Sequence, residues 1–557
     1  RFPAPGSEIF LVVRPNVRRH QFDEVAIRVA EVNVPVATFP LGFAFDRDMR
    51  VLQTRAPRIV VRKKNMFLRP RVVQNVMMPA TRSAEICAPL HSPLAALERF
   101  GATAGEALLA TGRWGLEREV MRVETDGQPA RSPHPFPLEE KQITVDFAEN
   151  QAELVTVPHD DPEAALAELS RLQGRLQRAI GGELLWPLSL PGRWDQPERV
   201  RAASFEGRPE WEAQRIYRRN LEQRHGKARQ VICGIHCNFS FTAEFFAGWR
   251  AATDASEPEK DLRDRAYFSV MRNFVRHQYV FNALAGVSPP GDAVFWRDLL
   301  AHTRADLRED AAHCRDHISS VRLSPLGYAL APDVARQIGV NFASLDEYRA
   351  KIAEAIQPRT SASPPLLAHE REFYSPVRPK PASVGSVGHA GMGSSRGERF
   401  ALLDALDREG VGYLEFRVFD LDPFEPVGIG PEAMRFFHAL VLACLFLPSP
   451  PISAAERERI TQRNRWSTLC GSSLRDSPCR PGPAERQDAT ILFDAMAVIA
   501  AELPAPYARA VAAGREKWEG GRLRPVDRLR DALDLGRKTQ LELGLTLAAQ
   551  HRASHTP

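Results

Sequence analysis

Residues 114–123 read WGLEREVMRV, and apolar and charged side chains alternate along this stretch. Strict alternation is typical of a half-buried β-strand, in which successive side chains point to opposite faces of a sheet. A strand places Glu117 and Glu119 together on one face. Leu116 and Val120 then lie on the other face, where they can pack against a core. The stretch therefore predicts a strand that projects two carboxylates from one side.

A second acidic stretch, residues 144–157, reads TVDFAENQAELVTV. It contains Asp146, Glu149 and Glu153. In a short helix these positions share one face, whereas an extended chain still aligns Glu149 with Glu153. Both conformations remain open at this point.

A third stretch, residues 412–420, reads GYLEFRVFD and again alternates. A strand here places Glu415 and Arg417 on one face, and Leu414 and Phe416 on the opposite, core-facing side. Each acidic segment taken singly is explained by a solvated strand face with salt bridges. Three such segments, each backed by apolar residues, favour a shared acidic pocket instead.

Convergence of these acids would require a compensating charge. Two carboxylates about 4 Å apart repel by roughly 4 kcal/mol at an effective dielectric constant of 20. Several together therefore need protons or bound cations. Hard oxygen ligands with few thiolates favour Mg²⁺ or Mn²⁺, which proteins commonly share with substrate phosphates.

The stretch VICGIHCNFSF, residues 231–241, also predicts a strand. A zinc site formed by Cys233, His236 and Cys237 is one interpretation. Strand parity argues against it, because both cysteines fall on the apolar face and His236 falls on the other face with Asn238. His236 is then either a residue of the acidic pocket or a structural histidine.

Composition limits the class of protein. The chain has 557 residues, of which 44% are hydrophobic and 26% are charged, as in globular proteins. The longest apolar run, residues 436–447, is too short to span a bilayer and predicts a buried helix. The seven cysteines show no disulfide framework, which indicates a reducing, cytoplasmic compartment. No P-loop motif occurs, so any nucleotide must be held in another way.

The charge is unevenly distributed along the chain. Residues 1–76 carry a net charge of +8, and residues 77–557 carry −3. We predict that residues 1–76 are a basic N-terminal extension, or an over-long translation outside the native protein with Met77 or Met78 as the true start; a small basic module is the alternative. The slightly acidic body, residues 77–557, gives no reason to expect a nucleic-acid partner. The Pro/Gly/Ser-rich stretch at 383–397 predicts a surface loop of unassigned role.

Eight motifs occur together in a recognisable order. They are WGLEREVMRV, TVDFAENQAELVT, WPLSLP (186–191), IYRRNLEQRHG (216–226), GIHCNFSF, VRLSPLGY (321–328), EFYSPVRPK (372–380) and YLEFRVFDLDPFEPVGI (413–429). In combination they resemble glutamate–cysteine ligase of the bacterial type. The resemblance begins near Met77 and weakens beyond the 460s. It implies an α/β (α+β) fold related to glutamine synthetase, with a curved, mostly antiparallel sheet that forms a cradle backed by helices.

The resemblance also implies an activity. The γ-carboxylate of glutamate attacks the γ-phosphorus of ATP, and the α-amine of cysteine then attacks the γ-glutamyl phosphate. The products are γ-glutamylcysteine, ADP and phosphate, in the first step of glutathione biosynthesis. Two or three Mg²⁺ ions, with Mn²⁺ as an alternative, are implied as cofactors, and ATP as a co-substrate.

Roles of individual residues follow from the same resemblance. The residues that match the metal ligands are Glu117, Glu119, Asp146, Glu153, His236 and Glu415. Arg417 matches the catalytic arginine that stabilises the transferring phosphoryl group, and Arg322 matches the arginine that holds a substrate carboxylate. The residues that match the cysteine pocket are Phe147, Tyr217, Leu221, Gln230, Tyr328 and Tyr374.

Two alternatives remain. The chain could be a carboxylate–amine ligase of this fold that uses another amine, or a non-catalytic paralogue that acts as a binding protein. The aromatic pocket argues against the first, and the complete set of acids argues against the second. We expect a cytoplasmic monomer with small-molecule substrates and with neither nucleic acid nor a membrane as partner.

Overall fold

The computed structural model describes five short strands within residues 24–69, and then residues 91–555. Within the second range it leaves out residues 206–207, 209–210, 358–364, 384–399, 470, 472–480 and 537. The chain forms two compact units, Arg1–Pro89 and Leu90–Pro557. Almost all of the loop predicted at 383–397 lies outside the described residues, and the status of 1–76 as an extension stays a prediction.

The first unit contains two small antiparallel sheets. One joins β1 (Glu24–Ile27) to β2 (Ala37–Pro40). The other has the order β3 (Arg50–Leu52), β4 (Ile59–Val61) and β5 (Leu68–Arg69).

The second unit is built on one antiparallel sheet with the strand order β11–β12–β10–β6–β8–β7, and with β9 paired to β6. The strands are β6 (Arg113–Val123), β7 (Ile143–Val145), β8 (Gln151–Val155), β9 (Leu184–Leu185), β10 (Ile235–Ser240), β11 (Val377–Lys380) and β12 (Tyr413–Phe419). β11 and β7 are its edges, so the described sheet is open.

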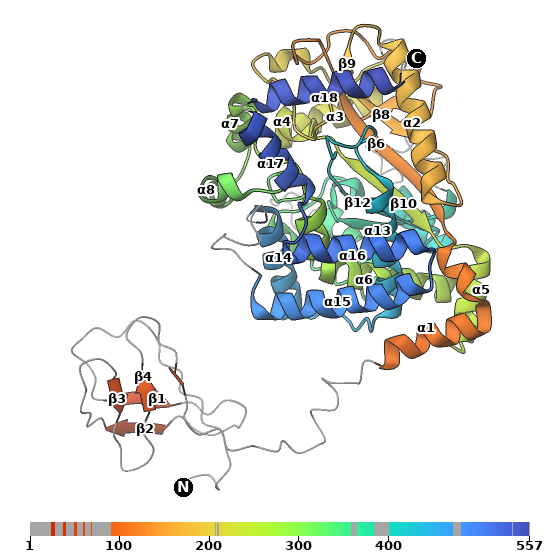
Figure 1. Ribbon diagram of the computed structural model, residues 1–557, viewed down its shortest axis with the longest axis vertical. Coiled ribbons are helices and arrows are strands. Elements are labelled where there is room, and N and C mark those ends of the chain that lie inside the picture. Colours follow the sequence, from red (N-terminus) through yellow and green to blue (C-terminus); the bar gives the residue numbers. More distant parts are fainter. Residues whose placement is uncertain are drawn as a thin grey trace. The chain divides into compact units, whose positions relative to one another are not determined.

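Helices make up most of the remainder (Figure 1). In the first half of the unit they are α1 (His91–Ala104), α2 (Pro162–Ala179), α3 (Glu212–His225), α4 (Lys227–Gln230), α5 (Ala243–Ala252), α6 (Glu259–Ala285), α7 (Ala293–Ala301) and α8 (Ala305–Cys314). In the second half they are α9 (Pro332–Ile338), α10 (Leu345–Ile356), α12 (Ala401–Glu409), α13 (Pro431–Phe446), α14 (Ala454–Leu469), α15 (Pro483–Ala501), α16 (Ala505–Glu519), α17 (Pro525–Gly536) and α18 (Gln540–His555).

The core lies between one face of the sheet and a layer of helices. The ring of Phe416 on β12 lies 4.9 Å from Phe274 of α6 and 4.9 Å from Phe437 of α13. On β6, Leu116 and Val120 are fully buried, as the alternation predicts. α15 and α16 pack against α13 as a second helical layer, and the layering is visible in Figure 1. The apolar face of the sheet is therefore covered, and the acidic face is left for a site.

The start of α2 follows directly from its sequence. Asp161 is the N-cap residue, because its side chain accepts a hydrogen bond of 2.8 Å from the backbone N–H of Ala164. Pro162 occupies the first helical position, where a missing N–H costs nothing. The apolar run at 436–447 lies within α13, apart from its last residue. The helices of the described ranges include none that is long and apolar enough to cross a membrane.

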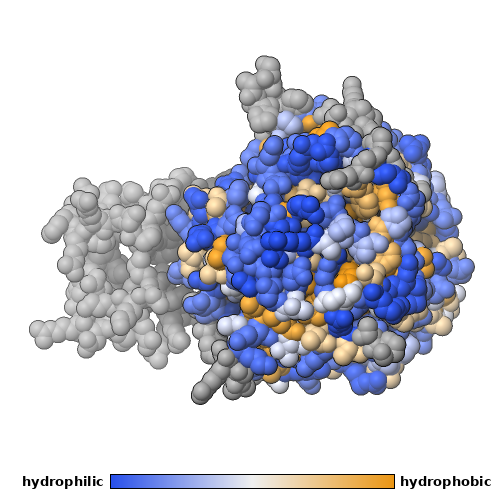
Figure 2. Space-filling view, turned by 90° about the horizontal axis from the view of Figure 1, so that it is seen from above, coloured by the Kyte–Doolittle hydropathy of each residue, from blue (hydrophilic) through white to orange (hydrophobic). Residues whose placement is uncertain are grey.

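The face of the described residues shown in Figure 2 is mostly hydrophilic, and apolar residues gather there in smaller patches.

The structure decides between the two conformations left open for residues 144–157. The helix is wrong: β7 and β8 form an antiparallel hairpin, with Val145 opposite Ala152. The hairpin keeps Asp146 near enough to Glu153 for their charges to interact, whereas Glu149 is directed away from them. The carboxylate of Glu149 accepts hydrogen bonds from the backbone N–H groups of Ser204, at 3.0 Å, and His134, at 3.3 Å.

Candidate active site

The register of four neighbouring strands brings distant acids together. His236 of β10 is opposite Glu117 of β6, and Glu119 of β6 is opposite Glu153 of β8. On the other side of β10, Asn238 is opposite Glu415 of β12. Because the pairing is antiparallel, residues at matched positions point to the same face. The predicted parity of all three strands is therefore confirmed.

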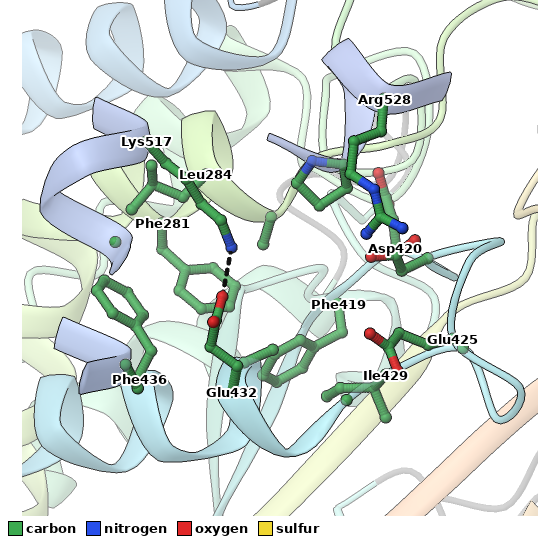
Figure 3. Close-up of a pocket in the computed structure, with 18 of the residues that line it drawn as sticks. Phe281, Leu284, Phe419, Asp420, Glu425, Ile429, Glu432, Phe436, Lys517 and Arg528 are labelled. Atoms are coloured by element: carbon green, nitrogen blue, oxygen red, sulfur yellow. Dashed lines mark hydrogen bonds and ion pairs between the residues drawn. The ribbon is translucent and has the colours of Figure 1, made fainter. Parts of the chain in front are cut away.

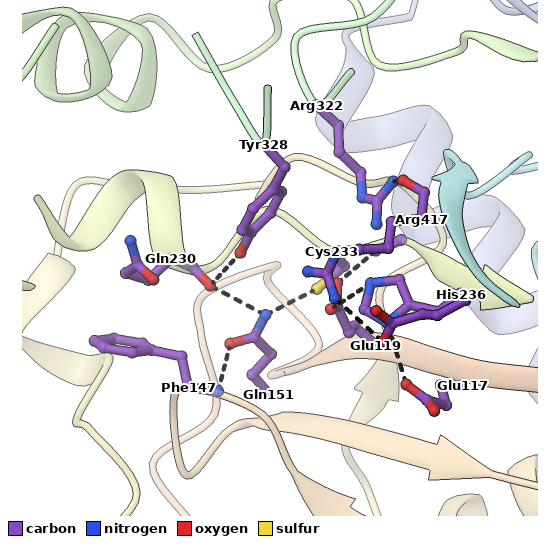
Figure 4. A network of polar contacts seen from close by, with 12 residues as sticks. Glu117, Glu119, Phe147, Gln151, Gln230, Cys233, His236, Arg322, Tyr328 and Arg417 are labelled. Carbon is purple, nitrogen blue, oxygen red and sulfur yellow. Dashed lines mark hydrogen bonds and ion pairs between the residues drawn. The ribbon is translucent and has the colours of Figure 1, made fainter. Parts of the chain in front are cut away.

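His236 lies at the centre of this group (Figure 4). Its Nδ1 lies 3.2 Å from Glu117 Oε2, and its Nε2 lies 3.5 Å from Glu119 Oε1. Asn238 donates a 2.7 Å hydrogen bond to the second oxygen of Glu117. The backbone N–H of Gly234 donates a 2.9 Å bond to Glu119 Oε2. The two carboxylates of β6 are thus held from β10 in fixed orientations.

Glu415 is surrounded by cations. Its Oε1 lies 3.4 Å from Lys380 Nζ and 3.6 Å from Arg417 Nη1. Its Oε2 lies 4.0 Å from Arg378 Nη1 and has no hydrogen-bond partner in the described part of the chain. Lys380 and Arg378 come from the edge strand β11, where Arg378 is paired with Glu415.

The donor set fits a divalent cation. Ligand atoms of Glu117, His236 and Glu415 all lie within 4.8 Å of one another, and no other such group occurs in the described ranges. Nε2 of His236 and Oε2 of Glu415 are buried, and neither atom makes a hydrogen bond within the described part of the chain. Buried polar atoms are nearly always satisfied, so these two are open positions for a ligand. Carboxylate oxygens with one imidazole suit Mg²⁺ or Mn²⁺.

The pKa values of three of the acids are raised. Burial, followed by the charge of Asp146, raises the pKa of Glu119 to about 8. Burial, followed by the charge of Glu117, raises the pKa of Glu153 well above its usual value. Burial also raises the pKa of Asp146. Several of these acids therefore retain protons near neutral pH when no cation is bound, as the repulsion argument requires.

The pKa values of two other groups of the site, Glu415 and His236, are lowered. Burial would raise the pKa of Glu415, but Lys380 and Arg417 outweigh it and hold this pKa below its usual value. Burial, followed by the charge of Arg417, lowers the pKa of His236 to about 4. His236 is therefore neutral at physiological pH and able to bind a metal ion through nitrogen.

Arg322 approaches from a loop above the sheet. Its Nη1 donates a 3.1 Å hydrogen bond to the backbone oxygen of Arg417, and its guanidinium lies 5.7 Å from the centre of the Tyr328 ring. The approach requires glycine at position 234, because a Cβ there would lie 2.0 Å from Arg322 Nε. The Nε atom of Arg322 has no hydrogen-bond partner in the described part of the chain.

The residues predicted for a cysteine pocket form a chain of contacts. The hydroxyl of Tyr328 donates to the backbone oxygen of Gln230 at 3.2 Å, and its ring lies 5.8 Å from that of Tyr374. Gln151 links the same oxygen of Gln230, at 3.3 Å, to the backbone N–H of Phe147, also at 3.3 Å.

The two remaining pocket residues lie on α3. The pKa of Tyr217 is raised by burial and then by the charge of Tyr374, which places the two phenols near each other. Leu221 is buried one turn further along α3. All fourteen residues that carry predicted roles therefore lie in described segments. Thirteen of them belong to the acidic cluster with its arginines or to the aromatic pocket, and Leu221 lies one helical turn from Tyr217.

Sequence reasoning missed several residues of this site. Lys380 and Arg378 lie beside Glu415, and Gln151 links the pocket, whereas Asn238 was already placed on the face of His236 by strand parity. Arg218 of α3 donates a 2.7 Å hydrogen bond through Nε to the backbone oxygen of Asp146. Lys380 and Arg378 alternate within the motif EFYSPVRPK, so the strand period carried a signal, but nothing in the sequence paired that strand with Glu415.

Strand parity placed Cys233 among apolar side chains on one face of the strand, but the structure places it before the strand and beside a polar side chain. It is fully buried, as predicted, but it precedes β10, and its sulfur lies 3.7 Å from Gln151 Nε2. Cys237 is buried within β10. The cation-binding group found in the described residues contains no cysteine, which agrees with the argument against a zinc site.

Comparison with protein families identifies the chain's relatives. The family description glutamate-cysteine ligase matches residues 97–466, about two thirds of the chain. The chain belongs to the glutamate-cysteine ligase family. It is 31% identical over 391 residues to the glutamate–cysteine ligase of Clostridium acetobutylicum, covering 66% of this chain and 78% of that one. It is 29% identical over 479 residues to the Janthinobacterium enzyme, covering 80% and 86%.

Solved structures show the same fold. The glutamate–cysteine ligase of Francisella tularensis, crystallised with AMP, superposes with a TM-score of 0.65 at 24% identity, covering 80% of this chain and 89% of that one. A bifunctional glutathione synthetase from Pasteurella multocida gives the same TM-score and identity, over 82% of this chain and 54% of its own. The predicted fold class, helices on an open, mostly antiparallel sheet, is confirmed for this member of the glutamate-cysteine ligase family.

Proposed function

We propose that the protein ligates the γ-carboxylate of L-glutamate to the α-amine of L-cysteine, driven by ATP, through a γ-glutamyl phosphate. One observation carries this proposal: acids from three strands and His236 from a fourth meet beside Arg417, on the open face of a fold shared with a known ligase. Family membership supplies the reaction type, and the geometry supplies groups suited to each part of it.

Divalent ions fit the acidic face. We assign Glu117, Glu119, Asp146, Glu153, His236 and Glu415 as the residues that hold them. When bound, such ions would neutralise the phosphates of the nucleotide and of the acyl phosphate. Without them, the buried acids hold protons instead.

Arg417 is the group assigned to the transferring phosphoryl. It is permanently charged, it lies 3.6 Å from Glu415, and it is largely buried, so its planar guanidinium is fixed before substrate arrives. A preorganised donor in a site that excludes water stabilises developing charge more than a mobile one does. Lys380, on the other side of Glu415, adds a second cation within reach of phosphate oxygens.

The aromatic pocket is assigned to cysteine. Tyr328 and Tyr374 present phenol rings and hydroxyl groups, which suit a polarizable thiol and a carboxylate respectively. Arg322, already oriented by Arg417 and Tyr328, is assigned to a substrate carboxylate. The cytoplasm as compartment and a monomeric state stay predictions from the sequence.

The test is an assay of ADP release with glutamate and a panel of amines, with and without Mg²⁺. The proposal expects turnover only with the metal, and strong selection for cysteine over alanine, serine and 2-aminobutyrate. Equal turnover with another amine would indicate a ligase of different specificity. Nucleotide binding without ADP release under any condition would indicate a non-catalytic paralogue.

A further inference from the structure

A cavity of about 530 Å³ lies away from the acidic cluster, where the ends of β12 and α6 meet the second half of α16 and the first turns of α13 and α17 (Figure 3). This volume lies within the range of roughly 300–1,000 Å³ typical of small-molecule sites. None of the residues assigned above lines it. Its walls are largely apolar, with Phe281, Leu284, Phe419, Ile429 and Phe436 among the lining residues. Leu523, which also lines it, has 52% of its surface exposed.

The charged residues of this cavity are not balanced. Glu432 is paired twice, with Lys517 Nζ at 2.8 Å and with Arg522 Nη2 at 2.9 Å. Both of these cations are thereby engaged by a single carboxylate. The other acids of the lining are Asp420, Asp422 and Glu425, and the remaining cation of the lining is Arg528, whose guanidinium lies 4.3 Å from the Phe424 ring centre. The charge of Arg322, which does not line the cavity, acts on Asp420, and that of Lys517 acts on Asp422 and Glu425. The residues that line the cavity therefore carry one more negative than positive charge.

Asp420 provides a second, independent sign of a missing partner. Its side chain is buried, with a relative exposure of 3%, and it lines the cavity. Oδ2 accepts hydrogen bonds from the Val287 N–H at 2.8 Å and from Ser288 Oγ at 2.9 Å. Oδ1 has no partner among the described residues. A buried acceptor left without a donor costs about 1–3 kcal/mol, so a donor brought by a ligand would be favoured.

The other two acids also lack strong partners. Asp422 accepts one hydrogen bond, 3.0 Å from the N–H of Phe424. The carboxylate of Glu425 has neither a hydrogen bond nor an ion pair within the described part of the chain. Burial raises the pKa of both groups, and the charge of Asp422 raises that of Glu425 further. A bound cation would relieve this repulsion.

The spacing of these acids favours an organic cation over a metal ion. Within the described ranges, the acidic cluster on the sheet is the single group of three ligand atoms close enough to hold an ion. The acids at the cavity are therefore too far apart to close around a metal. An ammonium group attached to an apolar body can reach separated carboxylates and also fill the apolar walls.

We propose that this cavity binds a small organic ammonium ion with an apolar body, whose charge is held by Asp420, Asp422 and Glu425. The apolar part lies against Phe419, Phe436 and the exposed side chain of Leu523.

The cavity is connected to the active site by hydrogen bonds. Ser288 Oγ donates to Asp420 and accepts a 3.2 Å bond from the backbone N–H of Arg322. Asp420 also lies three residues after Arg417 in the chain. Resting on the proposed function, occupancy of the cavity changes the affinity for the substrate whose carboxylate Arg322 holds. Linkage requires that substrate to change the affinity for the amine by the same factor.

The test uses 2-phenylethylamine as the probe and its carboxylate counterpart, 3-phenylpropionate, as the control, by calorimetric titration of the full chain without substrates. We expect the amine to bind and the acid not to bind. Glu425→Gln should weaken amine binding about tenfold or more, the loss expected for a charge-assisted hydrogen bond. Glu354→Gln, an exposed acid of α10, is the matched control and should bind as the wild type does.

A second variant, Arg528→Gln, distinguishes a loss of the binding site from a loss of the fold. Removing the cation that opposes the ligand should tighten amine binding severalfold, which a damaged protein would not do. Equal binding of amine and acid, an unchanged affinity in Glu425→Gln, or no binding of the amine at millimolar concentration would each overturn the proposal. Since these titrations contain no substrate, a failure of the ligase assay would leave their outcome intact.

Discussion

His236 and Glu117 face each other across β10 and β6, with Nδ1 and Oε2 3.2 Å apart, although 119 positions separate them in sequence. The contact depends on strand register, because a slip of one residue would move His236 to the apolar face. Burial, followed by the charge of Arg417, lowers the pKa of His236 to about 4 and keeps the imidazole uncharged. The imidazole therefore does not neutralise the negative charge of Glu117. The uncharged imidazole and the Glu117 carboxylate are therefore suited, together with Glu415, to bind a cation.

Arg417→Ala should lower kcat by roughly 10²–10³ while it leaves the fold intact, because one preorganised donor to the phosphoryl group is lost. Steady-state ADP release measures the effect, and circular dichroism checks the fold. Arg408→Ala, which removes an arginine 67% exposed on α12, is the control and should be silent. Near-normal turnover of Arg417→Ala would refute the role assigned to this residue.

Binding of Mg²⁺ should release protons. Glu119, with a pKa raised to about 8, and Glu153, with a pKa raised well above normal, are protonated near pH 7 and must ionise to hold a metal ion. Affinity for Mg²⁺ should therefore rise with pH from about 6 to 9, with release of about two protons at pH 7, one from each acid. Calorimetric titration in two buffers of different ionisation enthalpy measures this number.

The matched variant for proton release is Glu153→Gln, which should release fewer protons than the wild type. Identical heats in both buffers for the wild-type protein would contradict the assignment of these acids.

Glu370 should make stability fall as pH rises. Burial raises its pKa to about 7, although it accepts hydrogen bonds from the N–H groups of Leu402 and Leu403 at the start of α12. The folded state then binds the proton more tightly than the unfolded state, so stability is fully present below about pH 4.5 and declines up to about pH 7. The loss is at most about 3 kcal/mol.

Melting temperatures at pH 5 and pH 8 measure this effect. The wild type should lose more between the two values than Glu370→Gln, which has no proton to give up. A parallel loss in both proteins would show that Glu370 is not responsible.

A chain that starts at Met78 should retain full activity, within about twofold in kcat/KM. The family match begins at residue 97, and all residues assigned to the site lie beyond it. An insoluble or inactive product would show that residues 1–76 complete the fold.

Much of the sheet could be predicted from the sequence. Alternation alone gave β6 and β12, because each has one apolar face against helices and one polar face. The strand predicted at 231–241 is too long, since β10 covers Ile235–Ser240 and residues 232–234 precede it without regular structure, with Gly234 against Arg322. No local pattern encodes so close an approach between distant segments.

Other features depended on long-range pairing. For residues 144–157, the helix and strand periods fitted equally well, and pairing of β8 with β6 decided between them. Lys380 and Arg378 could not be predicted as neighbours of Glu415, because β11 is a four-residue edge strand. Its pairing with β12 is a long-range contact that no local sequence pattern indicates. The acids themselves were found because their spacing within each strand is local.

The most direct test of the central claim is anomalous diffraction from crystals grown with Mn²⁺ and a non-hydrolysable ATP analogue. We predict manganese peaks within ligand distance of Glu117, His236 and Glu415, with the terminal phosphate beside Arg417. Ordered nucleotide with manganese bound elsewhere, or with Glu117 and Glu415 free of metal, would contradict it.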